Sequence, residues 1–243
     1  MSDESSDLRA VLAPAAGRPQ RRKLPMWARS GLLGLCSGGA LLALAAATGP
    51  LVSVGGSAAT TRTSPILLLA GLPALLAVGW IIVRDWRHGA RGVGALLRDA
   101  LIIALVAGAL PLSGRWLASG DLAFQLVALQ LPGLSVALAA GFAFGSIRHD
   151  ADGWPSAEDA PRGAGIGCLG TMMFLLAALV IPVIVAGRMV PASTQSSAHT
   201  LGAGVVVAMV FSLLVGLLVI SLFTAPIAGM VGGYLRGEPP GER

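Results

Sequence analysis

The sequence predicts an all-α, polytopic integral membrane protein with six transmembrane helices and both termini on the cytoplasmic side. Of its 243 residues, 55% are hydrophobic and only 12% are charged, with a mean hydropathy of +0.78. Soluble domains are about 25% charged. The apolar residues fall into six long runs, and the cationic residues gather in alternate connections between these runs. The composition excludes a soluble domain, a disordered chain and a disulfide scaffold.

Residues 1–30 are predicted to form a mobile, polar cytoplasmic tail that begins acidic and becomes basic. Its prolines, Pro14, Pro19 and Pro25, disfavour a helix. A secretory signal would place its apolar stretch within the first 15–30 residues. Here the apolar stretch begins only at residue 31, so we expect it to be retained as the first transmembrane helix.

The membrane domain is predicted over residues 31–235, followed by a short tail at 236–243. About 20 apolar residues cross the hydrocarbon core as a helix. The sixth run is too long for one straight crossing, because 35 residues rise roughly 52 Å. It is expected to tilt, to continue into the cytoplasm, or to break at Pro226. The predicted spans are 31–54, 66–84, 98–117, 121–147, 166–187 and 201–235.

The distribution of charge predicts the orientation. With the N-terminus inside, the cytoplasmic segments hold 14 of the 17 cationic residues, and the outer loops hold only Arg62, Arg115 and Arg188. This asymmetry follows the positive-inside rule. It also accounts for the basic pI without nucleic acid as a partner, so the lipid bilayer is the partner expected first. Five aromatic residues fall near the predicted membrane interfaces, namely Trp27, Trp80, Trp86, Trp116 and Tyr234.

Each predicted span contains one proline, which removes a backbone donor and can kink a helix. We single out Pro73, Pro132, Pro182 and Pro226 as kinks, beside Pro50 and Pro111. One interpretation is a kinked outer half that opens a cavity. The other is that proline is simply common in transmembrane helices.

No charged residue lies deep in any predicted span, which argues against a proton-coupled carrier. The polar residues at depth are milder, and they are candidates either to line a cavity or to hydrogen-bond neighbouring helices. They are Gln125, Gln130, Ser135, Thr171, Ser212, Ser221 and Thr224. Four Gly-x-x-x-Gly pairs lie at the predicted cytoplasmic ends, where glycine permits close helix contact: Gly34/Gly38, Gly141/Gly145, Gly163/Gly167 and Gly229/Gly233.

The sequence predicts no catalytic residues, no metal ligands and no cofactor. Gly133-Leu134-Ser135 resembles the Gly-x-Ser motif of rhomboid proteases, which place that serine on the fourth of six helices. That family needs a histidine in its sixth helix as the base, and here His199 precedes the sixth span. His149, Asp150 and Asp152 are interpreted as a solvated loop rather than a metal site. Cys36 and Cys168 are expected to be inert, small buried side chains.

For function, the sequence favours a non-enzymatic membrane protein: an accessory or scaffolding subunit packed against a membrane-protein partner or a second copy of itself. The alternative is a small-solute transporter or its substrate-binding membrane subunit, since the six-helix layout is similar to that of the S components of energy-coupling-factor transporters. The absence of asparagine and the single lysine indicate a GC-rich coding sequence. The expected location is the plasma membrane of a bacterium or archaeon.

Overall fold

The computed structural model describes residues 24–52, 71–87, 92–117, 121–149, 152, 154–189 and 197–237. Within these ranges the protein is all-helical and has no β-strand, only an isolated bridge between His149 and Pro155. The six helices are α2 (Met26–Val52), α4 (Leu72–Arg87), α5 (Val93–Leu117), α6 (Leu122–Phe144), α7 (Ala160–Met189) and α8 (Ser197–Arg236). The all-α prediction is therefore confirmed for the described residues.

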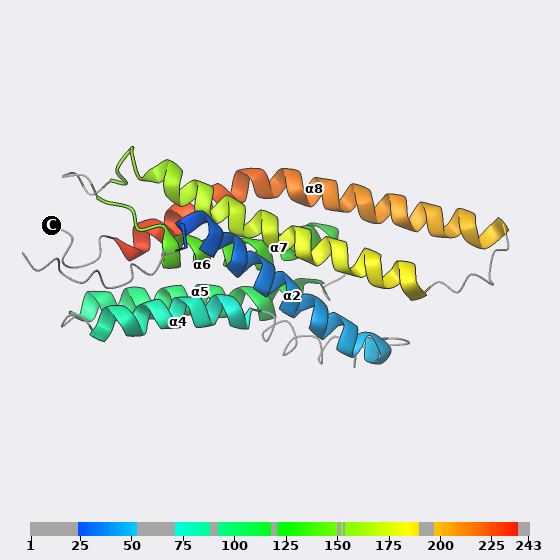
Figure 1. Cartoon of the computed structure of the whole chain (residues 1–243), viewed down its shortest axis with the longest axis horizontal. Coiled ribbons are helices and arrows are strands. Elements are labelled where there is room, and N and C mark those ends of the chain that lie inside the picture. The colour runs from blue at the N-terminus through cyan, green and yellow to red at the C-terminus, as the bar shows by residue number, and fades with distance from the viewer. Residues whose placement is uncertain are drawn as a thin grey trace, which may run out of the picture.

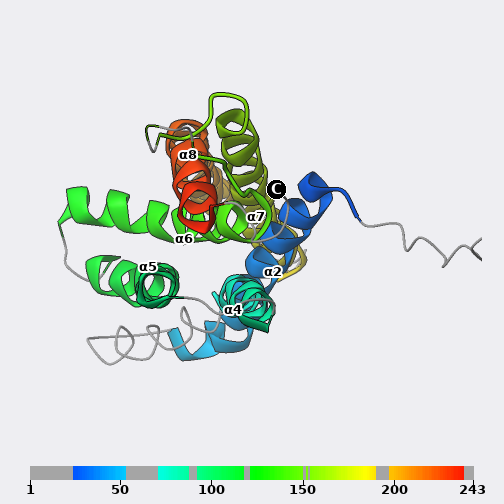
Figure 2. The same ribbon diagram turned by 90° about the vertical axis from the view of Figure 1, so that its left-hand side faces the viewer.

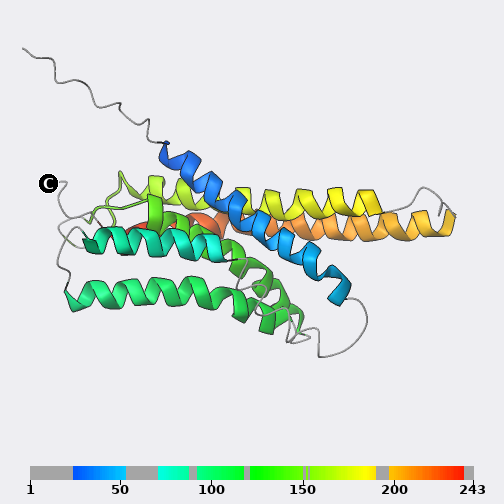
Figure 3. The ribbon, with the colours of Figure 1, turned by 60° about the horizontal axis from the view of Figure 1, so that its bottom comes forward.

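Helix α6 lies at the centre of the bundle. It packs against α7 and α8 on one side and against α4 and α5 on the other, and α2 crosses the edge beside α7 and α4 (Figures 1 and 2). Figure 3 shows α7 and α8 running side by side beyond the ends of the other helices. Helices α4 and α8 end, and helices α5 and α7 begin, at the same end of the bundle. We call it the arginine-rich end.

Local chemistry explains several helix boundaries. Helix α2 starts at Met26, directly after Pro25, so it begins five residues before the predicted span and includes part of the predicted tail. Asp121 caps α6, since its side chain accepts a hydrogen bond of 2.8 Å from the backbone N–H of Ala123. Gly237 ends α8 in the left-handed conformation, with a φ of 66°, which glycine adopts without steric cost.

Among the described residues, four helices contain stretches long and apolar enough to cross a membrane: Val93–Trp116, Val127–Phe144, Ala160–Ala178 and Val215–Arg236. Helix α4 has 16 residues and spans about 24 Å, less than the roughly 30 Å of hydrocarbon. Residues 66–70, which the prediction assigned to this span, lie outside the described residues. The four apolar helices are compatible with a membrane protein, and the count of six crossings stays a prediction.

The prolines occupy different positions in their helices. Pro111, Pro132 and Pro226 lie inside α5, α6 and α8. Helix α8 continues through Pro226 without a break, although it changes direction toward its C-terminal end (Figure 1). Pro73 lies in the first turn of α4, where a missing N–H costs no intrahelical hydrogen bond, so it is not an interior kink. Pro182 falls within α7, and its side chain is not among those described.

Glycines bring α6, α7 and α8 into direct backbone contact, and we call this contact the glycine seam. It comprises Gly141 of α6, Gly163 and Gly167 of α7, and Gly229 and Gly233 of α8. A Cβ on Gly229 would lie 2.5 Å from the carbonyl oxygen of Gly163 and 2.6 Å from the Cα of Gly167. A Cβ on Gly141 would overlap the carbonyl oxygen of Gly229. The glycines therefore set the separation of the three helices.

The remaining predicted glycine pair lies on α2. A Cβ on Gly34 would overlap the carbonyl oxygen of Gly170, and one on Gly38 would lie 2.6 Å from the Cβ of Ala177. Gly34 and Gly38 thus fit α2 against α7. All four Gly-x-x-x-Gly pairs consequently lie at helix contacts.

Candidate functional site

Gln130 and Ser221 form a buried polar contact between α6 and α8. The Ser221 hydroxyl donates a hydrogen bond of 3.0 Å to the side-chain carbonyl oxygen of Gln130. The Gln130 amide nitrogen donates to the backbone carbonyl of Leu217 at 3.4 Å. Both side chains are buried among apolar neighbours. Among the polar residues that the sequence singled out, Gln130 and Ser221 are in contact with each other. They lie 91 positions apart in the sequence and join α6 to α8.

Three of the other predicted polar residues donate hydrogen bonds to backbone carbonyls. Ser135 donates to the carbonyl of Pro132 at 2.7 Å, and Thr224 donates to the carbonyl of Ile220, one turn earlier in its own helix, at 3.0 Å. Thr171 of α7 donates to the carbonyl of Gly133 in α6 at 3.0 Å. Gln125 lies in α6, but its side chain is not among those described.

Two serines that the sequence analysis did not single out also join helices. Ser30 of α2 donates to the carbonyl of Ile166 in α7 at 2.5 Å, and Ser113 of α5 donates to the carbonyl of Ala128 in α6 at 2.7 Å. Ser37 of α2 differs, because its hydroxyl is fully buried and has no hydrogen-bond partner within the described ranges. Serine is common in transmembrane helices, so the sequence alone gave little reason to select these positions.

A cluster of charged residues at the arginine-rich end is the main feature that sequence reasoning missed. Asp85 of α4 and Asp99 of α5 are only 7% and 3% exposed. Asp99 forms an ion pair of 2.6 Å with Arg98 and accepts a hydrogen bond of 2.8 Å from the indole N–H of Trp86. Asp85 lies 3.2 Å from Arg84 and 3.9 Å from the buried Arg236 of α8. We call these six residues the ionic cluster.

The ionic cluster ties the α4–α5 hairpin to the rest of the bundle. One Arg236 nitrogen donates to the carbonyl of Ala143 at the end of α6, at 2.8 Å. Arg98 donates to the backbone carbonyl of Arg236 at 3.0 Å, and its guanidinium carbon lies 5.9 Å from the ring centre of Phe142. Cations near the carbonyl ends of helices interact favourably with the helix dipole. Four helices therefore meet through these charges.

The signal for this cluster was present in the sequence as two Arg-Asp pairs, Arg84-Asp85 and Arg98-Asp99. Both pairs lie at predicted membrane boundaries, where charged residues are ordinarily solvated. This local sequence does not distinguish an exposed aspartate from a buried one. The packing of α8 against this end brings Arg236 next to Asp85 and so offsets part of the cost of burying that carboxylate.

The remaining reactive side chains do not form a centre in the described part of the chain. No group of three or more His, Cys, Asp or Glu side chains able to hold a metal ion is found there. His149 packs edge-on against Tyr234, with ring centres 4.3 Å apart. Cys36 is exposed and Cys168 is half-buried, so neither is the fully buried side chain expected from the sequence. His199 lies in the first turn of α8 rather than in a loop.

Comparison with known proteins gives no further constraint, since no family model, no curated protein and no solved structure matches the chain.

Proposed function

We propose that the chain is a non-enzymatic, multi-pass subunit of a plasma-membrane complex, with an accessory or scaffolding role and both termini in the cytoplasm. The observation that carries this proposal is the use made of buried polar side chains. Ser30, Ser113, Gln130, Thr171 and Ser221 all form hydrogen bonds from one helix to another. Polar side chains that hydrogen-bond to a neighbouring helix hold the bundle together, so they are not available to bind a substrate.

The outer surface supports the same proposal. One side of α8 exposes a continuous series of large apolar side chains to the outside of the bundle, while its other side is fixed by the glycine seam. Without a partner, lipid covers such a surface. In a complex, the same surface offers contact to apolar helices of another protein or of a second copy. The exposed residues of α8 are Val215, Leu218, Val219, Ile220, Leu222, Phe223, Ile227 and Val231.

A small-solute transporter is the second candidate, and one contact favours it. The distance of 3.4 Å between the Gln130 amide nitrogen and the Leu217 carbonyl is at the long limit of a hydrogen bond. A rearrangement of α8 would therefore release this amide at little cost and expose it to a solute. Under this hypothesis, Gln125, Gln130 and Ser135 line the passage.

Gentle extraction from native membranes, followed by mass spectrometry of the co-purifying proteins, tests the first proposal. We expect a stoichiometric second protein, or a homo-oligomer, that cross-links to α8. Phe223→Ala with Ile227→Ala should weaken this association, and Leu97→Ala with Leu101→Ala, exposed on α5, serves as the matched control. A monomer that moves solutes in liposomes, and loses that flux on Gln130→Ala, would favour the transporter instead.

A further inference from the structure

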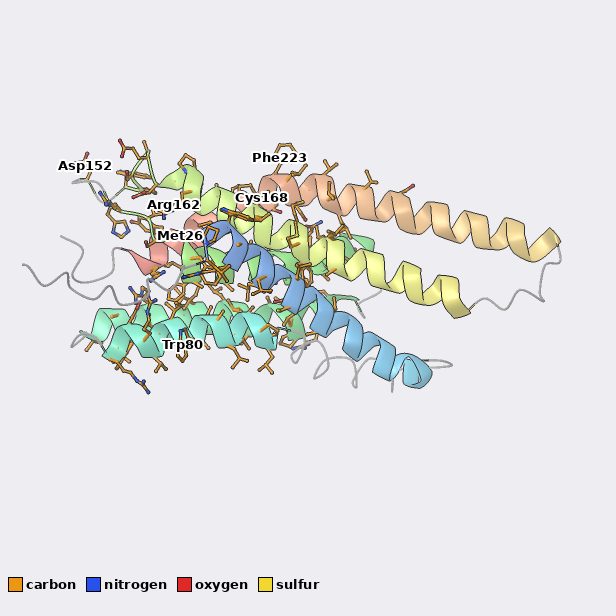
Figure 4. All side chains as sticks on the ribbon, in the orientation of Figure 1. Met26, Trp80, Asp152, Arg162, Cys168 and Phe223 are labelled. Atoms are coloured by element: carbon orange, nitrogen blue, oxygen red, sulfur yellow. The ribbon has the colours of Figure 1, made fainter. Side chains whose placement is uncertain are left out.

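Helix α4 has two chemically distinct faces. Ala74, Val78, Ile81 and Asp85 are buried against the bundle. The opposite face is exposed and consists of Leu72, Leu76, Trp80, Val83 and Arg87. Spacings of three and four residues place all five on one side of the helix. Trp80, 69% exposed, lies on the outside of α4 (Figure 4). The exposed face is thus an apolar stripe that ends in a guanidinium group.

The charge at the end of this stripe is positive. Three guanidinium groups, those of Arg84, Arg98 and Arg236, lie against the two carboxylates of Asp85 and Asp99. Both carboxylates are buried and turned toward the bundle. Arg84 and Arg87 are both exposed, so positive charge lies on the outer side of α4 at this end.

We propose that this face of α4 binds one anionic phospholipid, with an acyl chain along the apolar stripe and the phosphate between Arg84 and Arg87. From Leu72 to Val83 the helix rises about 16 Å, which matches half of the roughly 30 Å hydrocarbon core. The two guanidinium groups then lie at headgroup depth. Arginine pairs with phosphate through two parallel hydrogen bonds, and this geometry favours a phosphate over a diffuse negative surface. The proposal does not depend on the accessory-subunit role.

Fluorescence quenching by brominated phospholipids tests the site in the full-length chain. Trp27, Trp116 and Trp154 are replaced by phenylalanine, which leaves Trp80 and Trp86 as reporters. The protein is reconstituted in phosphatidylcholine containing a small fraction of brominated phosphatidylglycerol or brominated phosphatidylcholine. We expect the brominated phosphatidylglycerol to bind at least about fivefold more tightly, because each arginine near a membrane surface attracts anionic lipid to about that extent.

The matched variants separate a specific site from general surface charge. Arg84→Gln with Arg87→Gln should abolish the preference, and Arg148→Gln with Arg162→Gln, which removes two exposed arginines from the same end, should preserve it. Equal quenching by the two lipids in the protein that keeps Arg84 and Arg87 would overturn the proposal. So would quenching by neither lipid, which would mean that protein covers this face. Loss of the preference in excess inorganic phosphate would identify a site for free phosphate instead. Unfolding temperatures in detergent establish that each variant is folded.

Discussion

The hydroxyl of Ser221 donates a hydrogen bond to the side-chain oxygen of Gln130 at 3.0 Å, joining α8 to α6 in the interior of the bundle. In hydrocarbon the alternative to such a contact is an unsatisfied polar group. Measured side-chain hydrogen bonds between membrane helices contribute about 0.6 kcal/mol on average and about 1.7 kcal/mol at most. The contact is therefore a modest contributor to stability that selects one register between the two helices.

A double-mutant cycle measures this contact. We expect Ser221→Ala to reduce the free energy of unfolding by about 1 kcal/mol, because it leaves the Gln130 oxygen buried without its donor. Gln130→Leu removes the whole side-chain amide, including the oxygen that accepts from Ser221. In that background, Ser221→Ala should therefore lower the free energy of unfolding by less than Ser221→Ala does alone. The measurement is reversible unfolding in mixed micelles. Strictly additive effects would show that the two side chains do not interact.

Alanine substitutions in glycines test the glycine seam. We expect Gly229→Ala to destabilise the protein by about 1–3 kcal/mol, because the new methyl group would enter the backbone of α7. Gly108→Ala is the control, since a Cβ at this exposed position in α5 meets nothing within 4 Å. That change should be neutral or stabilising by up to about 1 kcal/mol. Thermal unfolding in detergent distinguishes the two, and equal effects would contradict the packing described.

Removal of one partner tests the ionic cluster. Arg236 and Asp85 have side-chain exposures of 9% and 8%, so Arg236→Gln leaves buried carboxylates with less compensation. We expect a loss of about 3–5 kcal/mol, as for other broken buried pairs. Arg148→Gln provides the contrast, because that side chain is 70% exposed beside Asp159 and its pair contributes at most about 1 kcal/mol. Asp85→Asn combined with Arg236→Gln should recover part of the stability. No recovery in the double variant would show that the two side chains act independently.

Two buried serines should respond in opposite directions. Ser37→Ala removes a hydroxyl that has no partner in the described structure, so we expect it to be neutral or stabilising by about 1 kcal/mol. Ser113→Ala removes the hydrogen bond to Ala128 and should destabilise by about 1 kcal/mol. The comparison uses the same unfolding assay. A destabilised Ser37→Ala variant would indicate a partner for this hydroxyl beyond the described residues.

Orientation in the membrane is tested by cysteine labelling. Cys36 and Cys168 are first replaced by alanine, and a single cysteine is then introduced as Asp152→Cys or Arg115→Cys, both at exposed positions near opposite ends of the bundle. A membrane-impermeant maleimide should label Arg115→Cys from outside the cell and Asp152→Cys only in inverted vesicles. The reverse pattern would contradict the predicted cytoplasmic location of both termini.

Apolar runs were sufficient to predict the six helices of the described residues, because backbone groups in a membrane must form their hydrogen bonds internally, which leaves few structures other than helices. The apolar runs did not predict the exact ends of the helices. Met26 is helical because Pro25 is well suited to precede a helix, and Phe144 ends α6 because Gly145 follows it. The pairing of Gln130 with Ser221, rather than with Thr224, depends on the rotation of α8, which composition does not encode.

The ionic cluster shows a different limit of sequence reasoning. Asp85 and Asp99 each follow an arginine at a helix end, and this local context is the same whether the carboxylate is solvated or buried. Asp85 is compensated in part by Arg236, which lies more than a hundred residues further along the chain. Long-range charge compensation of this kind is set by tertiary packing alone.

The distance in sequence between Asp85 and Arg236 also orders the protein's biogenesis. During synthesis the two aspartates leave the ribosome long before the last arginine of the cluster is made. Until α8 has been inserted, Asp85 in the α4–α5 hairpin lacks its counter-charge from Arg236. The ionic cluster is thus completed only when the C-terminal end of α8 is in place, and a chain truncated before Arg236 leaves Asp85 without one of its arginine partners.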